Sequence, residues 1–213
     1  NDNDSATTVR TPSASNRDVW TFSCWFKRGN LGAGSYSLFS AGANNNNQSV
    51  IDITGDAIRY VQVDANAVTD LVTTAGLLRD PSSWYHLVVA MDTTAGGAGT
   101  LQMYLNGAEV VYSGVNYPAA GVDTDFNSAA AHRIGADAQP TSYFDGYIAE
   151  AHFIDGTKLT PSAFGETNAD GVWVPIAYTG AYGTNGFYLD FANSADFGSD
   201  QSGNGNDFTD SGL

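Results

Sequence analysis

The residues best suited to hold a metal ion lie near the C-terminus of this 213-residue chain. Asp200, Asn204, Asn206 and Asp207 place four oxygen-bearing side chains within eight residues, with glycines between them. Ca²⁺ prefers carboxylate and amide oxygens, and glycine lets the backbone wrap around a cation. The spacing is not that of an EF-hand loop. The sequence therefore predicts calcium as a cofactor, with one alternative: Asx turns, in which these side chains hydrogen-bond their own backbone.

Nucleophilic and acid–base chemistry finds less support in the sequence. His86 and His152 fall within predicted strands, which favours packed or hydrogen-bonded roles, and His132 ends a loop, where we expect solvent exposure. There is no Gly-x-Ser-x-Gly nucleophile motif and no transition-metal spacing. The single cysteine, Cys24, alternates with aromatic residues, which predicts a small buried hydrophobe and excludes an internal disulfide framework.

The elements that must position such groups are organised around residues 84–112. Every second residue from Tyr85 to Met91 is apolar or aromatic and falls on one face of a predicted strand. Residues 93–99 form a Gly-rich loop, and Asn106-Gly107 is the dipeptide that favours a tight hairpin. The segment is predicted to form three antiparallel strands. Such a meander needs a second sheet to cover its apolar face.

Alternating apolar residues predict further strands along most of the chain. In residues 143–154, the pattern places every second residue from Tyr147 to Phe153 on one face. Residues 160–165 fit one helical turn with Thr160 as N-cap. Residues 114–131 read as a long surface loop, and such loops are often binding segments. The tail from Asp196 has little to bury. The other predicted strands are 5–11 (an edge strand), 20–28, 36–41, 49–53, 57–63, 68–74, 133–135, 171–178 and 186–192.

Size and composition favour a single all-β domain. The chain is 42% hydrophobic and contains 24 glycines, so a large core and many turns are available. Only Glu109, Glu150 and Glu166 are glutamates, which leaves little for a helix surface. The net charge of −15 opposes binding to nucleic-acid phosphates or to an anionic membrane. No segment is long and apolar enough to predict membrane insertion.

Three segments carry a resemblance to a known family. They are Trp20–Lys27, Trp84–Ala90 with Leu101–Glu109, and Phe144–Asp155, and together they resemble the concanavalin A-like superfamily, in particular its laminin-G and pentraxin-like modules. The match covers about residues 5–165. The resemblance implies an all-β, two-sheet antiparallel jelly-roll sandwich.

The same resemblance suggests how the domain is divided. Residues 1–165 would form the jelly-roll core, and residues 166–213 would add C-terminal strands and a Gly/Asn/Asp-rich extension that packs on the core or on a partner. The stretch from Tyr143 to Phe208 resembles a subtype found in virion proteins of marine tailed bacteriophages. Because Phe187–Phe208 is similar to the opening of another laminin-G-like module, we expect the native chain to continue past Leu213.

Glycosidases of this superfamily imply a test for catalysis. Their two carboxylates lie on a strand in the pattern Glu-x-Asp-x-x-Glu, flanking one glycosidic bond. The matching stretch here runs from Glu150 to Asp155; it has His152 in place of the second carboxylate and an aspartate, Asp155, in place of the third residue, a glutamate. The sequence therefore predicts a protein that is not an enzyme.

The function expected from the resemblance is that of a bacteriophage virion structural protein: a capsid decoration or fibre domain, or a tail adhesin. Its partners would be other virion proteins, its location the virion surface, and its assembly a homo-oligomer such as a trimer. Host-surface glycan is a further expected partner, with Asn44–Gln48, Tyr117 and Tyr143 on loops that could contact it. The alternative is a secreted or cell-surface bacterial carbohydrate-binding lectin module.

Overall fold

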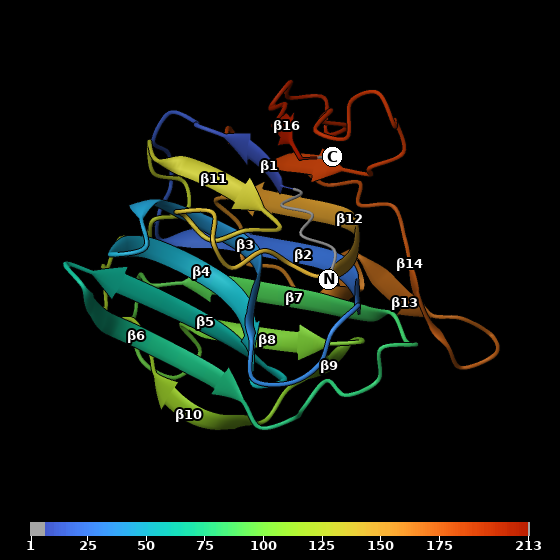
Figure 1. The fold of residues 1–213 in the computed structure, drawn as a ribbon, viewed down its shortest axis with the longest axis horizontal. Coiled ribbons are helices and arrows are strands. Elements are labelled where there is room, and N and C mark those ends of the chain that lie inside the picture. Colours follow the sequence, from blue (N-terminus) through green and yellow to red (C-terminus); the bar gives the residue numbers. More distant parts are fainter. Residues whose placement is uncertain (1–6, 213) are drawn as a thin grey trace.

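The computed structural model describes residues 7–212 and shows the predicted all-β sandwich of two antiparallel sheets (Figure 1). In the figure, strands of the larger sheet cross in front of strands of the smaller one. The eight-stranded sheet has the order β10 (Tyr112–Asn116), β6 (Ala67–Thr74), β5 (Ala57–Asp64), β4 (Asn47–Thr54), β3 (Ser35–Asn44), β11 (Ala131–Ile134), β1 (Thr7–Arg10) and β16 (Thr209–Ser211). The six-stranded sheet has the order β15 (Phe187–Leu189), β12 (Gly146–Asp155), β2 (Val19–Arg28), β7 (Tyr85–Asp92), β8 (Leu101–Leu105) and β9 (Ala108–Glu109).

The space between the sheets is filled by aromatic rings. Phe39 of the larger sheet stacks on Phe22 of the smaller one, with ring centroids 4.7 Å apart. Phe126 stacks on the other side of Phe39 at 4.5 Å, and Trp20 meets Phe126 edge-on at 4.8 Å. All four rings are fully buried. Rings in these arrangements add to the free energy gained from burying their area, so this stack is the centre of the domain.

The central meander is confirmed. Strands β7, β8 and β9 pair in sequence, and Leu87, Val89 and Met91 face the core. The hairpin between β8 and β9 turns at Asn106 and Gly107, whose φ angles of 48° and 84° are the positive values that this dipeptide tolerates.

The predicted alternation of residues 143–154 is wrong in its first half. Strand β12 contains a bulge between Ala149 and His152, and Glu150 adopts a φ of 51° there. The bulge reverses which side chains face inward, so Ile148 packs on the core before it and Phe153 after it. Tyr147, which was expected on the face of Phe153, is 65% exposed instead. An inserted residue shifts the two-residue period, which a sequence pattern does not reveal.

The two ends of the described chain also differ from expectation. Strand β1 is not an edge strand, because β16 pairs with it on the side away from β11. The tail does bury an apolar group: Phe208 lies edge-on to Phe187, at 4.7 Å. Residues 166–213 thus contribute β15 to one sheet and β16 to the other. The division at residue 165 stays a prediction.

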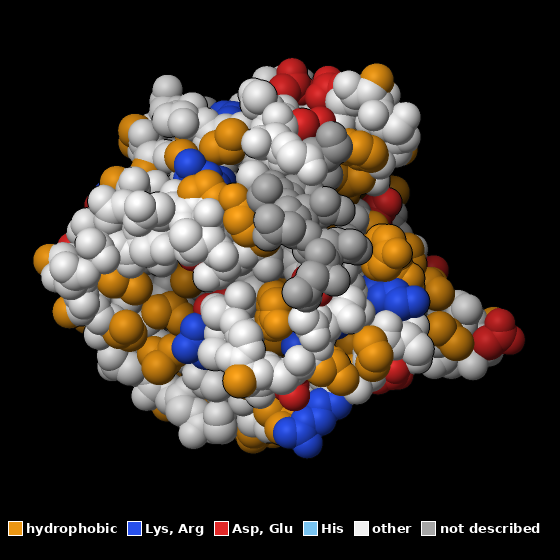
Figure 2. All heavy atoms as spheres, viewed as in Figure 1, with side chains coloured by type: hydrophobic (Ala, Val, Ile, Leu, Met, Phe, Trp, Pro, Cys, Tyr) orange, Lys and Arg blue, Asp and Glu red, His pale blue; other side chains and the backbone are white. Residues whose placement is uncertain are grey.

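A C-terminal layer covers part of the outer face of the six-stranded sheet. It contains a 3₁₀ turn, η1 (Pro161–Ala163), at the predicted helical turn, and the hairpin of β13 (Gly165–Thr167) and β14 (Trp173–Pro175), which projects from the sandwich (Figure 1). Figure 2 shows acidic side chains gathered over the C-terminal segments and at the tip of that hairpin. Within residues 7–212, no helix has the length and apolarity needed to cross a membrane.

Candidate functional site

A polar groove lies where strands β4, β5 and β6 meet the loop 117–130. Its volume is about 580 Å³, within the range of small-molecule sites. The strands end here and the loop closes over their ends, so the groove is built from the element ends and connections that commonly carry binding residues. Its lining residues are Arg17, Asn47, Gln62, Val63, Asp64, Thr69, Asp70, Asn116, Tyr117, Ala119, Val122, Asp123 and Asp125.

The loop that closes the groove is held rigidly from beneath. Phe126 fills the centre of the core, and the indole Nε1–H of Trp20 donates to Thr124 Oγ1 at 3.0 Å. Arg17 Nε–H donates to the Thr124 carbonyl at 2.6 Å. Residues 114–131 were expected to form a surface loop; in the structure their first part belongs to β10, and their middle inserts into the sandwich. A groove wall anchored in this way is preorganised for binding.

The floor of the groove is a hydrogen-bonded network around Gln62. The Gln62 carbonyl Oε1 accepts from the Tyr60 hydroxyl at 3.2 Å and from the Ser49 hydroxyl. Its amide Nε2 donates to Asp125 Oδ2 at 3.0 Å. The backbone N–H of Asp125 donates to Ser49 Oγ at 2.7 Å. These partners define the orientation of the amide and fix the Asp125 carboxylate at the groove surface.

Two carboxylates of the groove are partly removed from water. Burial raises the pKa of Asp70, whose Oδ2 accepts from Thr69 Oγ1 at 3.0 Å. Burial also raises the pKa of Asp125, which lies 3.8 Å from the Arg17 guanidinium. Desolvated carboxylates regain free energy when a ligand donates hydrogen bonds to them. The chemistry of this surface is therefore that of accepting hydrogen bonds from hydroxyl or ammonium groups.

The groove also contains an aromatic ring. Tyr117 is half-buried and packs on the main core, where it meets Tyr112 edge-on at 6.4 Å. An aromatic ring beside fixed polar acceptors is the combination that sugar rings require, because a sugar has an apolar face and a polar rim.

The structure brings together some of the residues that the sequence suggested for glycan contact and separates others. Asn47 and Tyr117 line the same groove. Asn45 instead bonds to Asp137 at 3.0 Å, and Tyr143 does not line the groove. Sequence reasoning missed Gln62, Asp70 and Asp125, because polar residues at strand ends look like ordinary turn residues until the strands are paired.

The cluster proposed for calcium is folded into a compact turn. Asp200 Oδ1 accepts from the backbone N–H groups of Tyr188 and Ser202, both at 2.9 Å. Its Oδ2 accepts from the Asn206 N–H and the Ser202 hydroxyl, both at 2.8 Å. Asp207 Oδ1 accepts from the Asp200 N–H at 2.8 Å. The carboxylate oxygens thus face backbone donors.

Positive charge beside this turn is supplied by the chain itself. Arg10 donates to Asn206 Oδ1 at 2.6 Å, and the amides of Asn204 and Asn206 donate to the Gly186 carbonyl at 2.9 and 2.8 Å. Among residues 7–212, no group of three or more His, Cys, Asp or Glu side chains could hold a metal ion. The observed hydrogen bonds are those of the Asx-turn alternative. Calcium binding stays a prediction.

Replacing Asp200 with alanine distinguishes a calcium site from the Asx-turn alternative. We expect Asp200→Ala to lower the melting temperature by roughly 6–12 °C, because three partly buried backbone N–H groups lose their acceptor at a total cost of about 3 kcal/mol. The loss should be equal in calcium and in chelator. Asn193→Ala, at an exposed turn, serves as the control. Stabilisation of the unmutated protein by calcium that Asp200→Ala abolishes would instead establish a metal site.

The histidines are structural. His86 Nδ1 accepts from Trp173 Nε1–H at 3.0 Å, and because tryptophan only donates, the His86 proton must lie on Nε2 and point to Ser23 Oγ at 2.9 Å. A histidine in this tautomer cannot take the serine proton. His132, expected to be exposed, is only 3% exposed and accepts from the Asn127 N–H at 2.9 Å. Cys24 is buried as predicted, and burial raises its pKa.

The carboxylates of the strand compared with glycosidases have structural partners as well. Glu150 Oε2 accepts from the Tyr188 hydroxyl at 2.6 Å. Asp155 is buried and accepts from the Asn185 N–H at 2.9 Å and from Ser15 Oγ at 2.7 Å. Neither residue lines the polar groove.

Comparison with known proteins places the fold. A protein of Bacteroides ovatus to which carbohydrate binding is attributed is similar with a TM-score of 0.60 and 14% identity, over 96% of this chain and 55% of that one. The NanB sialidase of Streptococcus pneumoniae is similar with a TM-score of 0.56 and 17% identity, over 75% of this chain and 27% of that one. Domain 4 of the arabinanase AbnA of Geobacillus stearothermophilus, in complex with arabinotriose, is similar with a TM-score of 0.51 and 20% identity, over 70% of this chain and 65% of that one. The matched region thus spans 65% or less of each of these chains.

No curated protein matches the chain in sequence. A family model, Laminin_G_3, described as concanavalin A-like lectin/glucanases superfamily, matches residues 1–163. The order of the strands, the jelly-roll sandwich and this match over most of the chain agree. The chain belongs to the concanavalin A-like lectin/glucanases superfamily.

Proposed function

We propose that this protein is a non-enzymatic carbohydrate-binding protein whose polar groove accepts a glycan. The observation that carries the proposal is the groove itself: two desolvated carboxylates, an oriented glutamine and a tyrosine ring line one preorganised cavity. Sugar hydroxyls would donate to Asp70 and Asp125, and the apolar face of a sugar ring would lie on Tyr117.

The charge of the groove favours neutral or amino sugars. Four carboxylates and one guanidinium line it, and Arg17 is already paired with Asp123 at 3.1 Å. A sialic acid or uronic acid would bring its own carboxylate into this negative potential and would be repelled.

One feature of the sequence supports a non-enzymatic role. Glycosidases of this superfamily carry their two carboxylates on one strand in the pattern Glu-x-Asp-x-x-Glu. The strand that carries Glu150 has His152 at the position of the second carboxylate, so that pattern is missing.

A panel of matched neutral and acidic oligosaccharides tests the proposal. We expect saturable binding to at least one neutral or amino-sugar oligosaccharide, and at least tenfold weaker binding when a sialic or uronic acid is added to it. The same oligosaccharides should release no reducing ends after long incubation. Absence of binding to every oligosaccharide of the panel would refute glycan binding. Release of reducing ends would refute a non-enzymatic role.

We further propose that the protein acts on the surface of a bacteriophage virion, as a decoration, fibre or adhesin domain alongside other virion proteins. The support is the resemblance of Tyr143–Phe208 to virion proteins of marine tailed phages. The alternative is a secreted or cell-surface bacterial lectin. Antibodies against the purified chain should label intact virions; labelling of bacterial culture supernatant or cells alone would favour the alternative.

A further inference from the structure

One end of the sandwich is built from four segments that are far apart in the sequence. They are residues 27–34, 54–57, 76–84 and 145–147, here called the loop end. Asp56 ties three of them together: its backbone carbonyl accepts from the Leu78 N–H at 2.8 Å, and its Oδ1 accepts from the Gly32 N–H at 2.9 Å. The buried Arg28 guanidinium also donates to Asp56 Oδ1, at 2.9 Å. These bonds fix the shape of the loop end, so it is preorganised to meet a partner.

The loop end exposes large apolar side chains. Within residues 7–212, eight such side chains are exposed, and four of them belong to the loop end: Leu31, Leu77, Trp84 and Tyr147. The rings of Trp84 and Tyr147 lie with their centroids 6.4 Å apart, and Lys27 is the cross-strand neighbour of Tyr147. Exposed apolar side chains that gather in one place mark interaction surfaces, and tryptophan and tyrosine contribute most to binding there.

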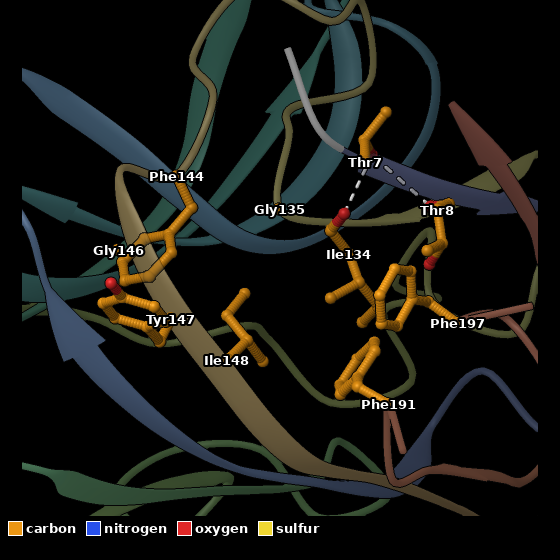
Figure 3. Close-up of a pocket in the computed structure, with 10 residues that line it drawn as sticks. All are labelled: Thr7, Thr8, Ile134, Gly135, Phe144, Gly146, Tyr147, Ile148, Phe191 and Phe197. Atoms are coloured by element: carbon orange, nitrogen blue, oxygen red, sulfur yellow. Dashed lines mark hydrogen bonds between the residues drawn. The ribbon is translucent and has the colours of Figure 1, made fainter. Parts of the chain in front are cut away.

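The apolar surface continues from Tyr147 toward the C-terminal segment. Tyr147 and Phe144 line a cavity of about 350 Å³, together with Phe191 and Phe197. Figure 3 shows Tyr147 and Phe144 on one side of this cavity and the other two rings on the opposite side. Tyr147 therefore belongs to two adjoining apolar surfaces, and covering it would extend the apolar area that the loop end can remove from water.

The charges of the loop end cancel, unlike those of the rest of the chain. Its basic residues are Lys27, Arg28 and Arg79, and its acidic residues are Asp56, Asp80 and Asp145. The net charge of −15 therefore lies entirely outside it. Two copies of this chain repel each other, and the repulsion is weakest where their loop ends meet. A surface that carries both signs of charge also becomes complementary to itself across a two-fold axis.

The loop end and the polar groove lie at opposite ends of the same strands. Strand β4 begins at the groove residue Asn47 and ends at Thr54, and β5 returns from Ala57 to the groove residue Asp64. The 8 residues of β4 span about 25 Å. A partner on the loop end therefore leaves the groove open.

We propose that the loop end docks a second copy of this chain about a two-fold axis. The apolar side chains of the two copies then cover one another, and the mixed charges surround them, as in specific protein interfaces. The two polar grooves open at the far ends of the dimer. The dimer does not depend on glycan binding, because the loop end contains no groove residue.

Sedimentation equilibrium of the full chain between about 1 and 500 µM tests the proposal. We expect the average mass to rise from 22.4 kDa toward twice that value and no further, because a two-fold contact closes on itself. Trp84→Ser combined with Tyr147→Ser should raise the dissociation constant of the dimer at least tenfold. Val68→Ser combined with Val172→Ser, at two exposed apolar side chains outside the loop end, should leave it unchanged.

A pair of charge variants tests the electrostatic part of the contact. Lys27→Glu gives both loop ends a negative charge and should weaken the dimer at least tenfold. Adding Asp145→Lys returns the charge of the loop end to zero and should restore the dimer.

Three results would overturn the proposal. The first is a mass that stays at 22.4 kDa over the whole range, which would leave the loop end to a sugar or to a different protein. The second is growth beyond the dimer, which would indicate a head-to-tail contact between different surfaces. The third is a dimer that the control variant weakens as much as the loss of Trp84 and Tyr147 does.

Discussion

Asparagine in place of Asp70 or Asp125 is expected to weaken glycan binding by roughly tenfold to hundredfold for each replacement, because each removes a charged acceptor worth about 1.5–3 kcal/mol to a hydroxyl donor. The side-chain shape is kept, and Gln62 can still donate to the carbonyl of an asparagine at position 125. Calorimetric titration with the best neutral oligosaccharide from the panel measures the loss.

The free energy of unfolding of these variants should rise or stay unchanged. Burial raises the pKa of both carboxyl groups, which means that the folded protein pays a desolvation cost to keep them ionised. Asp170→Asn, in the exposed β13–β14 loop, changes the net charge equally and serves as the control. Unchanged affinity in Asp70→Asn and Asp125→Asn would remove these residues from the binding site.

Acidification from pH 7 to pH 5 is expected to remove a large part of the folding free energy. Burial lowers the pKa of His86 and His132 to about 4, and burial followed by the nearby His86 lowers that of His152 to about 3. An unfolded histidine has a pKa of about 6.5. Between about pH 6.5 and the pKa values of the histidines in the folded protein, the unfolded chain binds more protons than the folded protein does. The free energy of unfolding therefore falls as the pH falls.

The size of this effect is large for a single domain. At pH 5 each histidine costs roughly 2 kcal/mol, and together they cost about 6 kcal/mol, against a usual stability of about 5–15 kcal/mol. Asp70 and Asp125 act with the opposite sign, since their raised pKa values let the folded protein take up protons first. The three histidines are more deeply buried, and their effect should dominate.

Urea unfolding at intervals between pH 7.5 and 4.5 measures the slope of the free energy of unfolding against pH. His152→Phe, which can keep the stacking on Tyr188 now seen with centroids 4.2 Å apart, should reduce the slope by about one third. A stability that is flat between pH 6.5 and 5, or a slope unaffected by His152→Phe, would contradict the assignment of these histidines as buried and neutral.

The sandwich could be predicted because its central strands follow a two-residue period. Leu87, Val89 and Met91 face the core as the pattern indicates, and Asn106-Gly107 turns where the dipeptide predicts. The bulge at Glu150 could not be predicted, since one inserted residue leaves no mark in composition. His132 was misplaced for a related reason: its burial depends on Phe39 and Phe126, which come from distant parts of the chain.

The candidate groove was predicted only in outline. The loop 114–131 was recognised as a candidate binding segment, and Asn47 and Tyr117 were both suggested for glycan contact. The carboxylates that define the chemistry were not found, because Asp70 and Asp125 are distant in sequence and meet only through the Gln62 network and the strand register. Their role in glycan binding, like that of Tyr117, stays a prediction.

The position of a bound sugar tests the central claim most directly. A crystal structure with the best-binding neutral oligosaccharide should place a sugar ring on Tyr117, with its hydroxyls donating to Asp70 and Asp125. The competing surface is the exposed aromatic pair of Trp84 and Tyr147, which are 43% and 65% exposed with centroids 6.4 Å apart. A sugar on that pair, with none in the groove, would contradict the proposed site.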